Sequence, residues 1–228
     1  MNPTEFLQRI DAAIARNAML SHPFYKMWNE GKLNAGVLGE YAKQYYAHVS
    51  AFPTYVSAVH SHCTDIPTRQ MLLENLIEEE RGADNHPELW LRFAEGLGVR
   101  REDVQNAALL QHTQESVAAM TSLSQNADPL CGIAALYAYE SQIPAVSLTK
   151  REGLHSYYGI EDERAVQFFR VHEYADVIHQ TVERDVLASS TDETRQEQII
   201  VAAEASSKAL WHFLDGVHEA YAQQCSVN

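Results

Sequence analysis

The apolar residues of this chain recur mainly at intervals of three and four positions, which is the spacing of one face of an α-helix. No alternating apolar and polar stretch of useful length indicates a β-strand. Glycine, proline and polar capping residues divide the pattern into helical segments. These segments are residues 4–17, 21–30, 34–63, 67–98, 101–124, 128–150, 161–188 and 191–224. We therefore predict an all-α bundle of seven or eight helices joined by short loops.

Three prolines bear on these boundaries. Asp128-Pro129 is typical of a helix start, because aspartate caps the first turn and proline fits within it. Pro53 lies inside the long segment 34–63 and can kink it, since proline removes a backbone donor. Pro87 disfavours the helical conformation of the preceding His86. Either the helix kinks at His86, or a new helix begins there with Pro87 in its first turn.

Composition and charge narrow the classes of protein. With 228 residues, 46% of them hydrophobic, and no evident linker, we predict one domain over residues 1–228. The net charge of −14 argues against nucleic acid or an anionic membrane as a partner. No apolar run approaches the roughly 18 residues that span a bilayer, and the first residues do not resemble a signal peptide. We therefore expect a cytoplasmic protein. Three widely spaced cysteines indicate neither a disulfide framework nor a zinc ribbon.

The most informative motif is His172-Glu-Tyr-Ala-Asp176-Val-Ile-His179. Its two histidines and its aspartate are spaced so that they form one stripe on a continuous helix. Phe168 and Val182 fall on the same stripe, which predicts that it faces the core. Imidazoles and a carboxylate in a core are costly unless something compensates them, as a transition metal would.

Two further segments place potential metal ligands on apolar faces. Segment 67–98 sets Glu79 and His86 two turns apart in a stripe that ends at Trp90. In segment 128–150, Glu140 is the only charge on a stripe that includes Ile143. The pooled set holds three carboxylates and three imidazoles, enough for two metal ions with open positions. Mixed nitrogen and oxygen ligands suit iron or manganese better than a closed structural zinc site. The six predicted ligands are Glu79, His86, Glu140, His172, Asp176 and His179.

A buried polar network without metal is the alternative interpretation. One histidine on an apolar stripe is more often a hydrogen-bonded core residue than a ligand. Three segments with the same anomaly change this balance, and three carboxylates in one pocket would repel one another without a cation. The pattern therefore favours a metal site.

Other segments carry a family resemblance. His22-Pro-Phe-Tyr25, Tyr41-Ala-Lys-Gln-Tyr45-Tyr46 and Phe52-Pro-Thr-Tyr55 resemble the superfamily of TenA and PqqC. Leu136-Tyr-Ala-Tyr-Glu140-Ser-Gln-Ile-Pro144, together with the histidine-rich motif, most resembles its CADD-like branch, named after a chlamydial protein associating with death domains. The resemblance covers nearly the whole chain, and all six predicted ligands match the positions of the family's ligands.

This resemblance implies a haem-oxygenase-like helical bundle that holds two metals instead of haem. It implies an oxidase that activates oxygen with iron, or with iron and manganese, and that needs a reductant. The CADD-like branch is associated with making para-aminobenzoate for folate from one of the protein's own tyrosines. Tyr25 matches that tyrosine, and Lys150 matches a lysine implicated as amino donor. In the mechanism that we infer, Tyr41 and Tyr45 carry an electron or line the pocket. A homodimer is also expected.

Three rival functions follow from the same resemblance. TenA-like proteins hydrolyse aminopyrimidines with a cysteine, and Cys131 is the candidate here, although the sequence offers it no evident base. A PqqC-like oxidase without cofactor would leave the six metal-type residues unexplained. A protein-binding module is the third alternative, but nothing in the sequence marks its interface.

Overall fold

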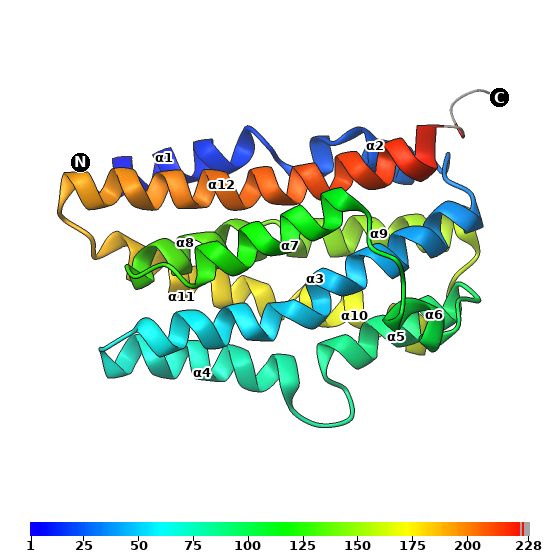
Figure 1. Ribbon diagram of the computed structural model, residues 1–228, viewed down its shortest axis with the longest axis horizontal. Helices are drawn as coiled ribbons and strands as arrows, with labels where there is room; N and C mark the ends of the chain where they lie inside the picture. The colour runs from blue at the N-terminus through cyan, green and yellow to red at the C-terminus, as the bar shows by residue number, and fades with distance from the viewer. Residues whose placement is uncertain (224, 226–228) are drawn as a thin grey trace.

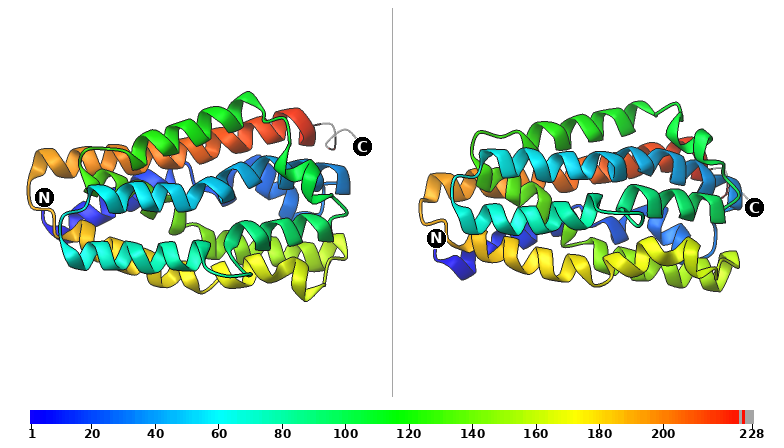
Figure 2. Two further views of the ribbon diagram at one scale, coloured as in Figure 1. Left: turned by 60° about the horizontal axis from the view of Figure 1, so that its bottom comes forward. Right: turned by 90° about the horizontal axis from the view of Figure 1, so that it is seen from below.

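In the computed structural model, which describes residues 1–223 and 225, the helices lie side by side along one long axis (Figures 1 and 2). No strand occurs among these residues, so the predicted all-α bundle is confirmed. Short 3-10 and π-helical turns lie at Met19–Ser21 and His218–Ala222. The α-helices are α1 (Pro3–Ala15), α2 (Pro23–Asn29), α3 (Ala35–His62), α4 (Ile66–Glu80), α5 (His86–Gly96), α6 (Arg101–Gln105), α7 (Gln111–Ser124), α8 (Pro129–Glu140), α9 (Ile143–Tyr158), α10 (Glu163–His172), α11 (Ala175–Ala188) and α12 (Glu193–Val217).

Polar side chains cap many of these helices, as the sequence predicts. The Asp128 carboxylate accepts a hydrogen bond from the Leu130 amide at 3.0 Å and so starts α8. The last long segment begins at Glu193, two residues later than its predicted start near Thr191, because Asp192 is the residue whose carboxylate caps α12. Its predicted end, Gln224, lies outside the described residues.

Four predicted long helices are interrupted. Of the two alternatives at Pro87, a kink or a new helix, the structure shows a new helix. Helix α5 begins at His86, and the Asn85 side chain caps it. Segment 101–124 divides into α6 and α7, and segment 128–150 divides between Glu140 and Ile143. Segment 161–188 divides into α10 and α11. By contrast, α3 continues through Pro53. A hydrophobic stripe alone therefore overestimates helix length.

The packing of the bundle brings distant parts of the chain together. Helix α12 packs against α1, α7 and α8, whereas α3 packs against α4, α5 and α7. Helix α10 lies along α5 and α9, and α11 lies along α8. Figure 2 shows α4 and α5 beside α10 and α11 on one side of the bundle. None of the described helices is long and apolar enough to cross a membrane.

His48 illustrates how this core treats a buried polar side chain. It is fully buried on α3, with Nε2 3.0 Å from the Ser116 hydroxyl oxygen. That hydroxyl donates to the Ala209 carbonyl at 2.6 Å, so the imidazole donates to it through Nε2. Its Nδ1 lacks a hydrogen-bond partner, and burial lowers the pKa of His48 to about 4.

We expect His48 to make the unfolding free energy of the metal-free protein depend on pH. Between pH about 6.5 and 4 the unfolded chain binds a proton at this residue that the folded chain excludes, so stability falls as the pH falls. The loss amounts to about 3 kcal/mol across that range. Urea unfolding at a series of pH values should show a shallower dependence for His48→Gln and no change for the surface variant His155→Gln. An unchanged slope in His48→Gln would contradict the prediction.

Candidate metal centre

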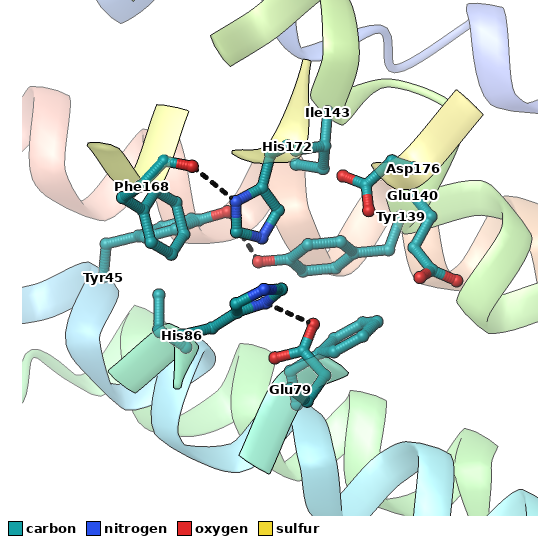
Figure 3. Close-up of a pocket in the computed structure, with 11 residues that line it drawn as sticks. Tyr45, Glu79, His86, Tyr139, Glu140, Ile143, Phe168, His172 and Asp176 are labelled. Atoms are coloured by element: carbon teal, nitrogen blue, oxygen red, sulfur yellow. Dashed lines mark hydrogen bonds and ion pairs between the residues drawn. The ribbon is translucent and has the colours of Figure 1, made fainter. Parts of the chain in front are cut away.

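The six predicted ligands lie in two groups, and in each group one ligand atom per residue lies within 4.8 Å of the others. Glu79, His86 and His172 form the first triad. Glu140, Asp176 and His179 form the second triad, and all six residues are buried. Figure 3 shows labelled side chains from both triads around one cavity. The sequence analysis pooled the six residues and did not predict this division.

Interruptions between helices position most of these side chains. The first triad gathers the end of α4, the start of α5 and the end of α10. The second triad combines the last residue of α8 with the first two turns of α11. Val182, predicted to face the core, is 37% exposed. The break between α10 and α11 changes the helix face that turns inward, so the predicted stripe does not continue to Val182.

The histidines of the first triad are held in the neutral form. His172 donates from Nδ1 to the Phe168 carbonyl at 2.7 Å, which leaves Nε2 free to bind a metal. His86 Nδ1 lies 2.8 Å from Glu79 Oε1 but is not aligned for a hydrogen bond. Burial lowers the pKa of both His86 and His172 to about 4. Both imidazoles are therefore neutral at pH 7, as metal binding requires.

The second triad is more acidic. His179 Nδ1 lies 3.3 Å from Glu140 Oε1 and 3.8 Å from Asp176 Oδ1. Burial alone would lower the pKa of His179, but the nearby carboxylates of Asp176 and Glu140 raise it to about 10. Its Nε2 lies 3.3 Å from Glu78, an arrangement in which an outer carboxylate orients a ligating imidazole. A bound cation at this triad would take the place of the His179 proton.

Unpartnered buried atoms provide a test of whether the triads fit a metal. His86 Nδ1, Glu140 Oε2 and Asp176 Oδ2 are buried without a hydrogen-bond partner. His179 Nδ1 also lacks one. Buried polar atoms are normally paired. A cation at each triad would accept the lone pairs of these atoms and so satisfy them. Carboxylates and imidazoles are also ligands that iron and manganese accept, so the residues fit such ions.

The cavity between the triads is small and mostly apolar in lining. Its volume of about 20 Å³ leaves room for about one water-sized molecule. Besides the ligands, Tyr45 and Tyr139 reach it, and their hydroxyl oxygens are 2.5 Å apart (Figure 3). Val49, Phe52, Ile143 and Phe168 complete the lining. A site of this kind excludes bulk water and strengthens electrostatic interactions within it.

The three predicted catalytic residues form a second buried cluster. The Tyr25 and Tyr41 hydroxyl oxygens are 3.0 Å apart, and the Lys150 amine donates to Tyr41 at 2.6 Å. The amine lies 5.3 Å from the centre of the Tyr25 ring. Burial holds the pKa of Lys150 well below its usual value, and it raises the pKa of Tyr25 well above 10. Burial thus favours the uncharged form of both the amine and the phenol.

Tyr45 links this cluster to the metal cavity. The Tyr41 and Tyr45 rings are stacked with their centres 5.5 Å apart, and the Lys150 amine lies 4.7 Å from the Tyr45 ring centre. Tyr25 is not among the residues that line the cavity. The structure therefore separates Tyr25 from the predicted ligands by two tyrosines, Tyr41 and Tyr45.

Sequence reasoning missed several residues of the site. Asn75 donates to Glu140 Oε1 at 2.8 Å, and Glu78 approaches His179. Glu183 is a further buried carboxylate on α11. Its position four residues after His179 continues the ligand stripe, and Asn75 lies four residues before Glu79. Extending each stripe by one helical turn would have identified both residues.

Comparison with known proteins identifies the family of this chain. A family model described as an iron-containing redox enzyme matches residues 39–211. The chain belongs to this family. Its matched region contains all six predicted ligands.

Named relatives extend across almost the whole chain. The chain is 39% identical to a 4-aminobenzoate synthase of Nitrosomonas europaea, over 97% of this chain and 94% of that protein. It is 38% identical to a 4-aminobenzoate synthase of Chlamydia pneumoniae, over 92% of this chain and 94% of that protein. These relatives confirm the predicted CADD-like resemblance, because 4-aminobenzoate is para-aminobenzoate.

A solved structure supports the fold. A TenA homologue of Pseudomonas syringae superimposes with a TM-score of 0.80 at 16% identity, covering 95% of this chain and 92% of that chain. The predicted TenA-like, haem-oxygenase-like bundle is thereby confirmed at the level of the fold.

Proposed function

We propose that this protein is an oxygen-dependent 4-aminobenzoate synthase that takes the aromatic ring of the product from its own Tyr25. The relatives named 4-aminobenzoate synthase support the product. The observation that carries the proposal is the continuous buried path from the Tyr25–Lys150 cluster, through Tyr41 and Tyr45, to a cavity with two groups of metal-type ligands. A substrate that is part of the chain also accords with a cavity of only about 20 Å³.

The two triads would each hold one transition metal, either iron in both or iron with manganese. The metals, when bound, supply the redox chemistry that activates molecular oxygen with electrons from an external reductant. Glu79, His86 and His172 would present one carboxylate and two neutral imidazoles. The second triad would present two carboxylates and one imidazole. The Phe168 carbonyl and Glu78 would fix the orientation of the His172 and His179 rings.

The tyrosines would connect this centre to Tyr25. Tyr45 lies beside the cavity, and its ring stacks on Tyr41, whose hydroxyl contacts the Tyr25 hydroxyl. An electron can therefore pass from Tyr25 toward the cavity over short steps between aromatic rings, while the hydroxyl contact accepts or returns a proton. Tyr139, bonded to the Tyr45 hydroxyl, would fix the ring at the cavity end.

Lys150 would supply the nitrogen: its amine would condense with the oxidised Tyr25 ring at the carbon that carries the phenol oxygen, and that oxygen would leave as water. Hydrolysis at Nζ–Cε would then leave an aldehyde on Lys150, and oxidation by molecular oxygen would break the Tyr25 Cα–Cβ bond and convert Cβ to the carboxylate. A neutral amine is a nucleophile, whereas a protonated one is not, and burial keeps the pKa of Lys150 low. Its amine lies over the Tyr25 ring, 5.3 Å from the ring centre, which is close enough for direct transfer of the nitrogen to that ring. The Tyr41 hydroxyl holds that amine by accepting its hydrogen bond.

The rival role of Cys131 has little support in this geometry. Burial raises the pKa of the Cys131 thiol to about 11, which disfavours the thiolate that acts as nucleophile. Cys131 borders a surface groove between α8 and α12 with Val201, and it does not line the metal cavity.

Product analysis tests the proposed function. We expect protein loaded anaerobically with ferrous iron, with or without manganese, to release 4-aminobenzoate when oxygen and a reductant are added. No other substrate should be needed, and the yield should not exceed one molecule per chain, because each chain has one Tyr25. Samples without metal or without oxygen are the controls. Mass spectrometry that finds no product, or finds product only after an aromatic precursor is added, would reject self-supply of the ring.

A further inference from the structure

Glu183 is a buried acid that the proposed mechanism does not use. It lies on α11, four residues after His179 and seven after Asp176, and therefore on the same face of the helix. Its side chain is 0% exposed to solvent. A carboxylate removed from water in this way is costly unless a cation or several hydrogen bonds compensate it.

The protein residues described in the structure do not provide that compensation. Both carboxylate oxygens of Glu183 lack a hydrogen-bond partner. The neighbouring cation, Arg184, is directed elsewhere, since its guanidinium binds the Asp11 carboxylate and the Tyr137 hydroxyl. The ionisable residues that share its face of α11 are Asp176 and His179, and both belong to the second triad with Glu140. Its surroundings are therefore acidic.

The buried polar atoms without a hydrogen-bond partner are concentrated at the second triad and Glu183. Nine buried side-chain atoms of the described residues have no hydrogen-bond partner, and five of them belong to four neighbouring residues. These atoms are Glu140 Oε2, Asp176 Oδ2, His179 Nδ1 and both oxygens of Glu183. All five offer lone pairs when the carboxyls are ionised and the imidazole is neutral. One cation is the partner that could satisfy them together.

We propose that Glu183 is an additional ligand of the cation held by Glu140, Asp176 and His179. The inference rests on the proposed metal centre and deepens it by making the second site a three-carboxylate, one-imidazole site. Glu183 lies one helical turn beyond His179 on the face of α11 that carries Asp176 and His179, so its carboxylate is the next oxygen donor along that face for a cation at the triad. The first triad, with a single carboxylate, has no such neighbour in its group.

Binding of Mn²⁺ alone, without oxygen or turnover, tests this role. Electron paramagnetic resonance of free Mn²⁺ during titration of metal-free protein gives the number and affinity of its sites. We expect about two ions per wild-type chain, one for each triad. In Glu183→Gln, one of them should bind more weakly by more than the roughly 10–100-fold that loss of an outer-shell partner costs. Asp185→Asn, an exposed change on the same helix, should bind as the wild type does.

Two further variants assign the effect. In a His172→Ala background, which disables the first triad, Glu183→Gln should weaken the remaining site. Glu183→Ala should weaken it as much as Glu183→Gln does, since both remove the carboxylate. An amide can still donate a hydrogen bond to Glu140, so wild-type affinity in Glu183→Gln would overturn the proposal and leave Glu183 as a hydrogen-bonding support. A wild-type protein that binds no Mn²⁺ or ferrous iron would instead reject the metal centre itself.

Discussion

Tyr25→Phe is expected to abolish 4-aminobenzoate formation and to leave metal binding intact. The phenol is the group whose oxidation the proposed reaction requires, and phenylalanine is far harder to oxidise. The change should cost little in folding, because the ring stays packed and the Tyr41 hydroxyl keeps its bond from Lys150. Tyr25 does not line the metal cavity, so metal content should be unchanged. Product is measured by mass spectrometry after reconstitution with iron, reductant and oxygen.

A second buried tyrosine provides the matched control. Tyr55 lies on α3, and its hydroxyl contacts the Val117 carbonyl at 3.4 Å, away from the cavity lining. Tyr55→Phe should therefore give the wild-type yield. Protein grown with ring-labelled tyrosine should release labelled 4-aminobenzoate. Undiminished product from Tyr25→Phe, or unlabelled product from labelled protein, would rule out Tyr25 as the source of the ring.

The sequence predicted which residues would gather at the metal centre because each stands out against its surroundings. Glu140 is a charge in an otherwise apolar helix, and the spacing of His172, Asp176 and His179 is regular. Burial of these side chains then follows from amphipathic packing. The division into two triads could not be predicted in this way, since it depends on the helix break at Glu173–Tyr174. That break carries no glycine or proline signal.

The periodicity of hydrophobic residues could not predict the Tyr25–Lys150 cluster. The two residues are 125 positions apart and belong to α2 and α9, which meet only in the folded bundle. Neither residue type is unusual where it stands, because a buried tyrosine is common and a lysine near a helix end is commonplace. The family resemblance singled them out, and the structure adds that Tyr41 joins them. Long-range contacts of this kind cannot be predicted without knowledge of the fold.

Replacing His172 with alanine is the second change with a large expected effect. His172 supplies one of the two imidazoles of the first triad, and Glu79 and His86 alone would leave that ion with two protein ligands. We expect metal content to fall from about two ions per chain to about one, because the second triad shares no ligand with the first. Product yield should fall by at least the roughly 10–100-fold that loss of an outer-shell partner costs.

Elemental analysis of freshly purified protein and of protein loaded anaerobically with ferrous iron gives the metal content directly. His62→Ala removes an exposed histidine at the end of α3 and is expected to retain both ions. His172→Ala removes a neutral side chain with its bond to the Phe168 carbonyl and its ring contacts with His86 and Phe168, so circular dichroism must accompany the metal analysis to show that the variant is folded. Retention of two ions in His172→Ala would show that His172 is not a ligand. Loss of both would show instead that the two triads bind metal cooperatively.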